Sequence, residues 1–316
     1  MSFREARTSS IRRRSEVPIS AAAEAPTPAS LTPLLQQRAF VLFWLARVFS
    51  TAAYQMLAVA VGWEIYALTG SAFDLGLVGL VQFVPVVLLS LVIGHVADRY
   101  DRRLIVTGCQ FFSAVAAAVL VAGTIGQWLS VPAILGVILV LGTARAFQLP
   151  TLQALLPGLV PAAQLSRAVA GSTTANQTAI IVGPAIGGLL YVAGPEVVFG
   201  TSAALFLIAG VLVSMIRTLE APPPRVPATL ESVFAGFRFV WKDPALLGVV
   251  SLDLFAVLLG GATALLPLFA KDILHTGPWG LGLLRSAPAV GALAMSAYLS
   301  RWPIERSVGP KLFAVV

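Results

Sequence analysis

The chain has little of what most catalytic and metal sites are built from. Its 316 residues include one cysteine, Cys109, and two histidines, His95 and His275. A single cysteine excludes an internal disulfide and a cysteine-based metal site, and two isolated histidines do not make a histidine cluster. The isolated serines of the chain and these two histidines form no catalytic set. We therefore expect no metal, no cofactor and no enzymatic activity.

Charge is also scarce. Charged residues make up 11% of the chain and hydrophobic residues 58%, against about 25% and about 45–50% in soluble proteins, and the mean hydropathy is +0.88. This balance excludes a soluble domain, a disordered chain and a collagen. The net charge of +7 would suggest nucleic acid as a partner of a soluble protein, but in a membrane protein the distribution of charge matters more. We predict an all-α polytopic membrane protein whose partner is the lipid bilayer, with no nucleic acid.

Apolar stretches long enough to cross a bilayer recur along the sequence. A spanning helix needs about 20 mostly apolar residues, and eight stretches qualify, with a polar linker between the sixth and the seventh. The predicted spans are Ala39–Trp63, Leu75–Ile93, Leu104–Gly126, Leu129–Pro150, Ala168–Ala193, Val197–Ile216, Ala245–Ala270 and Gly280–Ser300.

These spans divide the chain into four parts. Residues 1–37, rich in Ser, Arg, Pro and Ala, are expected to form a disordered cytoplasmic arm, and residues 38–217 a bundle of six helices. Residues 218–244 are predicted to be a cytoplasmic linker in which Ser232–Lys242 has the spacing of an interfacial helix. Residues 245–316 are predicted to hold two further spans and the start of a ninth, a partial second bundle.

The basic residues predict the orientation. If the arm is cytoplasmic, almost all of the 21 Lys and Arg residues fall in cytoplasmic segments, the exceptions being Lys271 outside and three arginines within spans. Short cytoplasmic loops carry such an excess. All six tryptophans lie near span ends, where indole rings favour the interface. The N-terminus is therefore predicted to be cytoplasmic.

The turn after the second span carries the most specific motif. It reads Gly94-His95-Val96-Ala97-Asp98-Arg99-Tyr100-Asp101-Arg102-Arg103. A glycine, then Ala-Asp-Arg, then paired basic residues resembles the cytoplasmic signature of the major facilitator superfamily of transporters. Glycine permits close helix packing, and an aspartate can cap a helix start. The alternative is that these charges only hold the topology. The resemblance implies a cytoplasmic gate of Gly94, Asp98, Arg99, Arg102 and Arg103.

The fifth span contains a second motif. It resembles the core of the antiporter motif of exporters in the superfamily and consists of Gly183, Pro184, Gly187 and Gly188. Small residues let a partner helix approach closely, and ordinary close packing is the alternative interpretation. The segments Gly277–Pro288 and Leu75–Pro85 further resemble the exporter branch that includes the enterobactin exporter and drug efflux transporters.

Charges within spans give the remaining candidates, because such residues are costly and usually face a cavity or a partner. Arg47, Arg145 and Asp253 lie at similar depths in spans 1, 4 and 7, which line the central cavity in the superfamily. Leu141, Arg145 and Gln148 also resemble its fourth-helix pattern, although Leu149 replaces an expected glycine. An interfacial position for Arg145 and a fixed ion pair for Asp253 are the alternatives, and Arg285 is predicted near the outer end of span 8. The predicted proton or substrate pathway comprises Arg47, Arg145, Gln148 and Asp253.

The resemblance implies a function as well as a fold. It predicts a secondary transporter of the bacterial inner membrane that exports a hydrophobic or amphipathic small molecule, such as a drug or a siderophore, and is coupled to protons. No phosphate-binding loop of the Gly-x-x-x-x-Gly-Lys type occurs, so ATP hydrolysis is not expected. Because the fold of the superfamily has twelve spans, a truncated, non-transporting membrane fragment is one alternative. A nutrient importer is the other, against which the antiporter motif argues.

Overall fold

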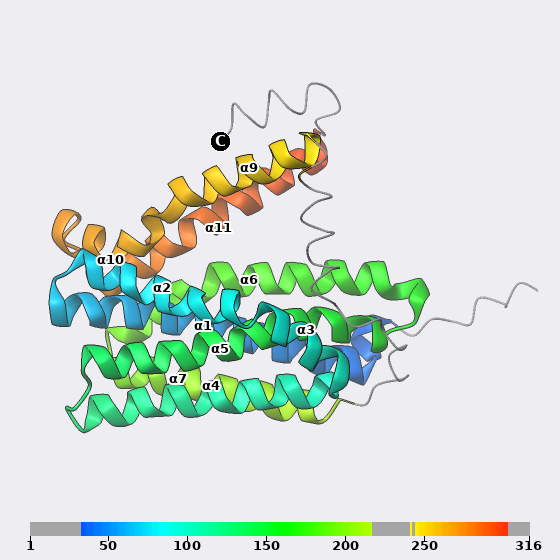
Figure 1. Cartoon of the computed structure of the whole chain (residues 1–316), viewed down its shortest axis with the longest axis horizontal. Helices are drawn as coiled ribbons and strands as arrows, with labels where there is room; N and C mark the ends of the chain where they lie inside the picture. Colours follow the sequence, from blue (N-terminus) through cyan, green and yellow to red (C-terminus); the bar gives the residue numbers. More distant parts are fainter. Residues whose placement is uncertain (1–32, 217–240, 242–243, 303–316) are drawn as a thin grey trace, which may run out of the picture. The chain divides into compact units, whose positions relative to one another are not determined.

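The computed structural model describes residues 33–216, 241 and 244–302, and its helices belong to one compact unit, Leu34–Val316. Every regular element in these residues is a helix (Figure 1). The predicted all-α fold class is therefore confirmed. Residues 1–32 of the predicted arm, nearly all of the linker with its interfacial helix, and the predicted ninth span lie outside the described residues.

The helices follow the predicted spans closely. The described α-helices are α1 (Arg38–Thr69), α2 (Ala72–Leu88), α3 (Ser90–Arg99), α4 (Arg102–Ile125), α5 (Val131–Leu155), α6 (Leu165–Tyr191), α7 (Pro195–Ser214), α9 (Pro244–Leu259), α10 (Leu266–Leu268) and α11 (Pro278–Arg301). Single turns of 3₁₀-helix lie at η1 (Leu34–Gln36), η2 (Leu156–Gly158) and η3 (Ala162–Gln164), a longer one at η4 (Gly260–Leu265), and a π-helical turn at η5 (Phe269–Ile273).

Local capping signals set several of these boundaries. Gly70, with φ of 61°, ends α1 in the left-handed conformation that glycine adopts without strain. The Ser71 hydroxyl accepts a hydrogen bond from the Asp74 N–H at the start of α2, and the Asp101 carboxylate caps α4 in the same way. Short connections between long helices therefore follow directly from the sequence.

Two of the predicted spans are interrupted. The stretch predicted over Leu75–Ile93 is divided into α2 and α3 at Leu89, one turn after Pro85, which lies inside α2. Proline removes a backbone donor and its ring clashes with the preceding turn. The stretch predicted over Ala245–Ala270 stops being α-helical at Leu259, where 3₁₀ geometry begins in a segment of low helix propensity. The prediction of one continuous helix is wrong at both places.

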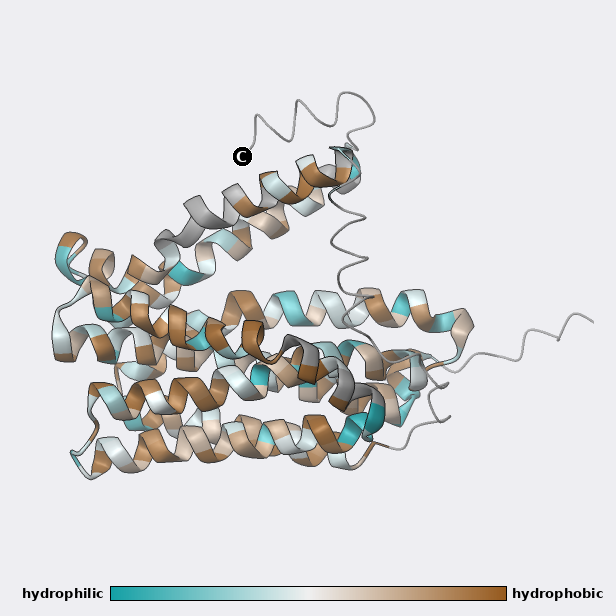
Figure 2. Cartoon of the chain, in the orientation of Figure 1, coloured by the Kyte–Doolittle hydropathy of each residue, from teal (hydrophilic) through white to brown (hydrophobic). Residues whose placement is uncertain are grey.

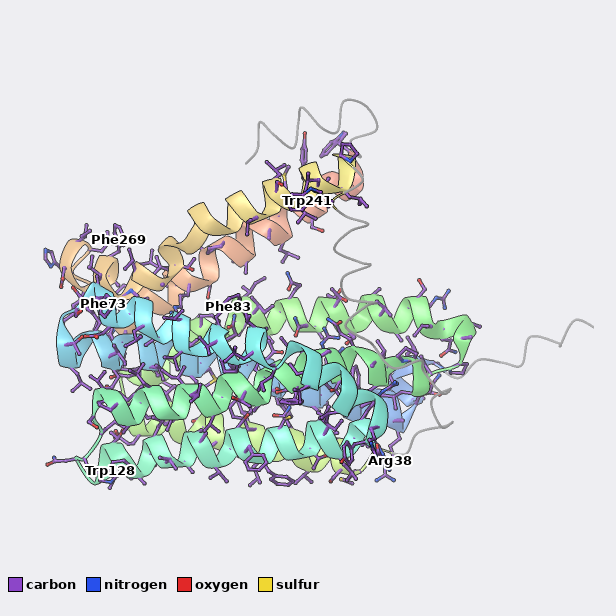
Figure 3. All side chains as sticks on the ribbon, in the orientation of Figure 1. Arg38, Phe73, Phe83, Trp128, Trp241 and Phe269 are labelled. Atoms are coloured by element: carbon purple, nitrogen blue, oxygen red, sulfur yellow. The ribbon has the colours of Figure 1, made fainter. Side chains whose placement is uncertain are left out.

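Four described helical segments are long and apolar enough to cross a membrane. They are Arg38–Thr69, Arg102–Ile125, Val131–Gly158 and Pro195–Ser214, with Ala72–Leu88 as a shorter apolar helix. Figure 2 shows hydrophobic residues along most of the helices and hydrophilic ones at several turns and on α6. Arg38 and Trp128 lie at opposite ends of these helices (Figure 3). The count of eight spans stays a prediction.

The buried core lies among α1, α4, α5, α6 and α7, with α2 packed on α5. One cluster is centred on Leu120, Ile134 and Phe206, and a second on Phe43 and Ile216 nearer the start of α1. Many large apolar side chains on the outer faces of these helices are exposed, as lipid-facing residues are. Helix α1 contacts α2, α5, α6, α7 and α11, and the candidate site is built around α1.

Candidate functional site

One face of α1 carries a row of polar contacts to its neighbours, which we call the α1 polar row: Arg47, Ser50, Thr51 and Tyr54. Their spacing of three and four residues places them on one helix face. Arg47 donates to the Ser172 hydroxyl of α6 (2.9 Å), and the Thr51 hydroxyl donates to the Asn176 amide oxygen (2.8 Å). The other two residues of the row, Ser50 and Tyr54, contact α5.

Arg145 and Gln148 of α5 contact the same row of α1. The Gln148 amide donates to the Ser50 hydroxyl at 2.5 Å, and both groups are buried. The Arg145 guanidinium lies 3.6 Å from the centre of the Tyr54 ring, a cation–π contact that holds the charge inside the bundle. The row therefore contains one predicted pathway residue, Arg47, and is contacted by two others, Arg145 and Gln148.

The fourth predicted pathway residue is not tested by these contacts. Asp253 lies in α9, but its side chain is outside the described part of the structure. Its pairing with Arg145 or Arg47 stays a prediction. The same holds for the Asp98 side chain of the predicted gate, which belongs to α3.

Two of the three basic residues of the predicted gate, Arg102 and Arg103, connect helix ends. Arg102 donates to the Ala154 carbonyl near the end of α5 (2.9 Å), and Arg103 donates to the Ile216 carbonyl just after α7 (2.6 Å). A cation at the carbonyl end of a helix also meets its negative dipole end. Arg103 is bonded to the Asp101 carboxylate as well (2.9 Å), and this hydrogen bond holds the pKa of Asp101 below its usual value.

The predicted antiporter motif is a surface of close backbone contact. A Cβ atom added to Gly183 or Gly187 would lie 2.8 Å from α1, at Gln55 and Met56 respectively. A Cβ atom on Gly188 would lie 2.5 Å from the Pro278 carbonyl oxygen of α11. The contact is reciprocal, because a Cβ atom on Gly282 of α11 would lie 2.5 Å from the Pro184 carbonyl oxygen. The motif thus packs α6 against α1 on one side and α11 on the other.

A cavity of about 410 Å³ lies beside the end of the α1 polar row. Its wall is formed by α1, α2, α5, α6 and α11 together with η4 and the first residue of α10, and most of its lining side chains are apolar. The lining residues able to make polar side-chain contacts are Tyr54, Gln55, Gln82, Thr263 and Arg285.

Arg285 is the charged residue of the cavity wall. The end of its guanidinium lies 3.4 Å from the Cβ position of Gly62 on α1, and its Nε atom is buried without a hydrogen-bond partner in the described structure. Both Arg285 and Arg145 act electrostatically on the Tyr54 phenol. The sequence places Arg285 near the outer end of span 8 and leaves its direction open, whereas the structure directs it into the cavity.

A pair of tyrosine–carboxylate hydrogen bonds lies farther along α1. Tyr66 donates to Asp272 of η5, and Tyr191 of α6 donates to Glu64 of α1. Both carboxylates therefore have partners of their own and neither lines the cavity. Phe73 and Phe269, labelled in Figure 3, mark the same end of the helices.

A comparison with known protein families shows to which family the chain belongs. Residues 28–306 match the family of transmembrane secretion effectors. The chain belongs to this family of the major facilitator superfamily. The resemblance predicted from the gate and antiporter motifs is thus confirmed, and the family is one of membrane transporters, not of enzymes.

Two relatives of the chain are named as an efflux protein and an exporter. Macrolide efflux protein A of Streptococcus pyogenes is 26% identical over 264 residues, which cover 80% of this chain and 64% of that protein. The enterobactin exporter EntS of Citrobacter koseri is 28% identical over 301 residues, which cover 91% of this chain and 68% of that protein. The chain therefore spans somewhat less than two thirds of the length of the first of these relatives.

Solved structures show the same fold. A bacterial homologue of the human lysosomal transporter Spinster superposes with a TM-score of 0.67 at 14% identity, covering 86% of this chain and 64% of that one. The nucleoside transporter NupG superposes with a TM-score of 0.63 at 13% identity, covering 83% of this chain and 68% of that one. Identities this low establish the fold alone.

Proposed function

We propose that this chain exports hydrophobic or amphipathic small molecules across the bacterial inner membrane, with its N-terminus in the cytoplasm. The observation that carries the proposal is the cavity of about 410 Å³, whose wall is mostly apolar and joins α11 to the α1–α7 bundle. Cavities that hold small organic ligands have volumes of about 300–1,000 Å³ and are mostly apolar with a few polar groups. The names of the exporting relatives support the direction of transport.

Movement of the wall is a second requirement of transport. The antiporter motif supports export because α6 contacts α1 and α11 through glycines in its C-terminal half, so two surfaces of backbone can move past each other without interlocked side chains. The gate residues Gly94, Asp98, Arg99, Arg102 and Arg103 are proposed to close the cytoplasmic end. Arg102 and Arg103 support this role by joining α4 to α5 and α7.

Proton coupling is the third part of the proposal. Asp253 is the acid that the sequence places well within a predicted span, and we propose it as the proton carrier. Arg47, Arg145 and Gln148 then form the polar pathway beside α1. An aspartate in an apolar setting is stable when protonated or paired, and can change state as a cavity opens to one side and then the other.

Reconstitution of the 316-residue chain tests the proposal. Purified protein in liposomes is given an inward or outward pH gradient, and movement of the neutral hydrophobic dye Nile red is followed by fluorescence. We expect pH-driven dye movement in the wild type and its loss in Asp253→Asn, with dye binding retained. Asp74→Asn, an acid in the first turn of α2 outside the proposed pathway, is the matched control and keeps the coupling.

Two outcomes contradict the proposal in different ways. Absence of both binding and movement of hydrophobic dyes would remove the cavity as a substrate site. Dye binding without movement would favour the non-transporting membrane protein that the sequence leaves as an alternative. Unchanged pH-driven transport in Asp253→Asn would leave export in place and remove Asp253 as the carrier.

A further inference from the structure

We infer that the cavity selects anionic amphipathic molecules, which place an acidic head at Arg285 and an apolar body against α1, α2 and α5. This inference rests on the proposed function, because it names the chemical class of substrate for the same cavity. The inference is carried by the charge of the cavity wall. Among its described lining residues Arg285 is positive and the others are neutral.

The position of Arg285 is fixed by the contacts of its own helix. The reciprocal glycine contact seats the first turns of α11 on α6, and the hydroxyl of the neighbouring Ser286 donates to the Ile181 carbonyl (2.6 Å). Arg285, one residue earlier, is thereby directed at α1 near Gly62. The guanidinium is held on a packed segment of helix and does not depend on a surface loop for its direction.

This guanidinium has unused hydrogen-bonding capacity. An arginine side chain offers five N–H donors and no acceptor, and the Nε donor of Arg285 is buried without a partner in the described structure. A buried cation needs a counter-charge or hydrogen-bond acceptors. The planar fork of guanidinium fits a carboxylate or a phosphate with two parallel hydrogen bonds, so an acidic ligand group is the partner that completes it.

A second cation strengthens the field at the same place. Arg145 lies behind the Tyr54 ring, with 3.6 Å between its guanidinium carbon and the ring centre, and it acts on the same phenol as Arg285. Tyr54, which lines the cavity together with Arg285, therefore has a second cation at its ring. The remaining polar groups of the wall, Gln55, Gln82 and Thr263, are neutral.

The nearby acids that the structure describes do not cancel these charges. Glu64 accepts from Tyr191, Asp272 accepts from Tyr66, and neither belongs to the cavity wall. A cationic amphiphile would thus meet Arg285, with Arg145 close by at the Tyr54 ring, and no compensating carboxylate in the described wall, whereas an anionic one would be attracted. Charge complementarity of this kind discriminates between ligands of equal apolar area.

Three probes with one apolar body and different heads test the inference. They are 11-(dansylamino)undecanoic acid, its methyl ester and the primary amine N-dansyl-1,11-diaminoundecane. Each is bound to the purified chain in detergent micelles and followed by dansyl fluorescence. We expect the acid to bind at least about tenfold tighter than the ester, and the amine to bind weakest. Equal affinities, or tighter binding of the amine, would overturn the inference without any variant.

Substitutions locate the effect. Arg285→Gln should bring the ratio of acid to ester affinity close to one, whereas Arg285→Lys should keep most of the preference for the acid. Arg301→Gln, an exposed arginine at the end of the same helix, is the matched control and should change nothing. An acid preference that persists in Arg285→Gln would refute the assignment of the site.

The two proposals fail separately. If ester and acid both bind and move with equal efficiency, export of hydrophobic molecules stands and anion selection is refuted. If no probe binds, the cavity is not a substrate site and both proposals fall. Should Arg285→Gln not fold, the comparison of the three probes on the wild type and on Arg285→Lys decides the matter.

Discussion

The contacts that stabilise the α1–α7 bundle differ from those that attach the α9–α11 segment to it. The bundle buries two clusters of large apolar side chains and joins its helices by several hydrogen bonds between side chains. From the second segment, Ala270 and Leu281 enter a buried apolar cluster, where they meet Val59 of α1. Within α11 the residues from Gly280 to Gly282 are buried, whereas those from Gly291 to Tyr298 are exposed.

This difference shows which contacts carry the attachment of α11. In lipid, apolar burial gives little drive for helices to associate, so close packing of small residues and hydrogen bonds between helices decide. For this segment these are the glycine crossing of α6 and α11, the Ser286 hydroxyl bond to α6, and the Tyr66–Asp272 bond to α1. A part held by few directional contacts can be displaced as a unit while the bundle keeps its packing.

The largest expected effect comes from breaking the glycine crossing. Gly282→Ala places a methyl group 2.5 Å from the Pro184 carbonyl oxygen, and such overpacking costs about 1–3 kcal/mol. Gly291→Ala, on the same helix with nothing within 4 Å of its Cβ position, should gain up to about 1 kcal/mol from helix propensity. Unfolding in mixed micelles measures the change in the free energy of unfolding of both variants. Equal changes would show that α6 and α11 are not in close contact at the glycine crossing.

An effect of opposite sign is expected inside the bundle. Gln110 of α4 is fully buried, and neither atom of its amide has a hydrogen-bond partner in the described residues. Replacing a buried, unbonded polar group with an apolar one of similar size removes a desolvation cost. Gln110→Leu should therefore raise the free energy of unfolding by about 1 kcal/mol. A clear loss of stability in the same micelle assay would mean that the amide has a partner.

A smaller effect tests the polar contacts of α1. A double-mutant cycle with Gln148→Leu and Ser50→Ala should give a coupling energy of about 0.6 kcal/mol, the usual value for hydrogen bonds between membrane helices. The control cycle pairs Ser50→Ala with Thr143→Ala, whose hydroxyl bonds to the Leu139 carbonyl within α5. Coupling of equal size in both cycles would argue against a specific contact between α1 and α5.

The smallest effect concerns pH at the start of α4. The Asp101 pKa is lowered in the folded state by its hydrogen bond to Arg103, so the resulting stability is present at neutral pH and lost as the pH falls through the folded-state pKa. Arg103→Gln should cost about 0.5 kcal/mol at pH 7, and part of that difference should disappear in acid. The bond of Arg103 to the Ile216 carbonyl does not titrate and leaves the remainder. Arg99→Gln is the control, and a pH-independent difference for Arg103→Gln would remove the assigned cause.

Hydropathy located the helices well because apolar length is a direct requirement of the bilayer. It did not locate their interruptions, since one proline, Pro85, and the segment after Leu259 act on backbone geometry and barely change the average. The close approach of Gly183, Gly187 and Gly188 to other helices was predicted from their motif, because glycine spacing itself encodes contact.

The face that a polar residue presents could not be predicted in the same way. Arg285 and Tyr54 meet at the cavity because α11 crosses α6 at a particular rotation, and rotation depends on residues far apart in sequence. The signal available was the cost of a charge within a span, which identifies the residue but not its direction. The roles of Asp98 and Asp253 stay predictions, because their side chains lie outside the described structure.

The place of the glycine crossing along α11 has a mechanical consequence. Gly282 is close to the start of a helix that continues to Arg301, so the crossing is a fulcrum with a long lever arm on one side, about 28 Å at 1.5 Å per residue. A tilt of about 10° at the fulcrum displaces the far end by about 5 Å, comparable with one helical turn. Arg285, only three residues from the fulcrum, hardly moves in the same tilt. The lever can therefore swing while the charge that faces the cavity stays in place.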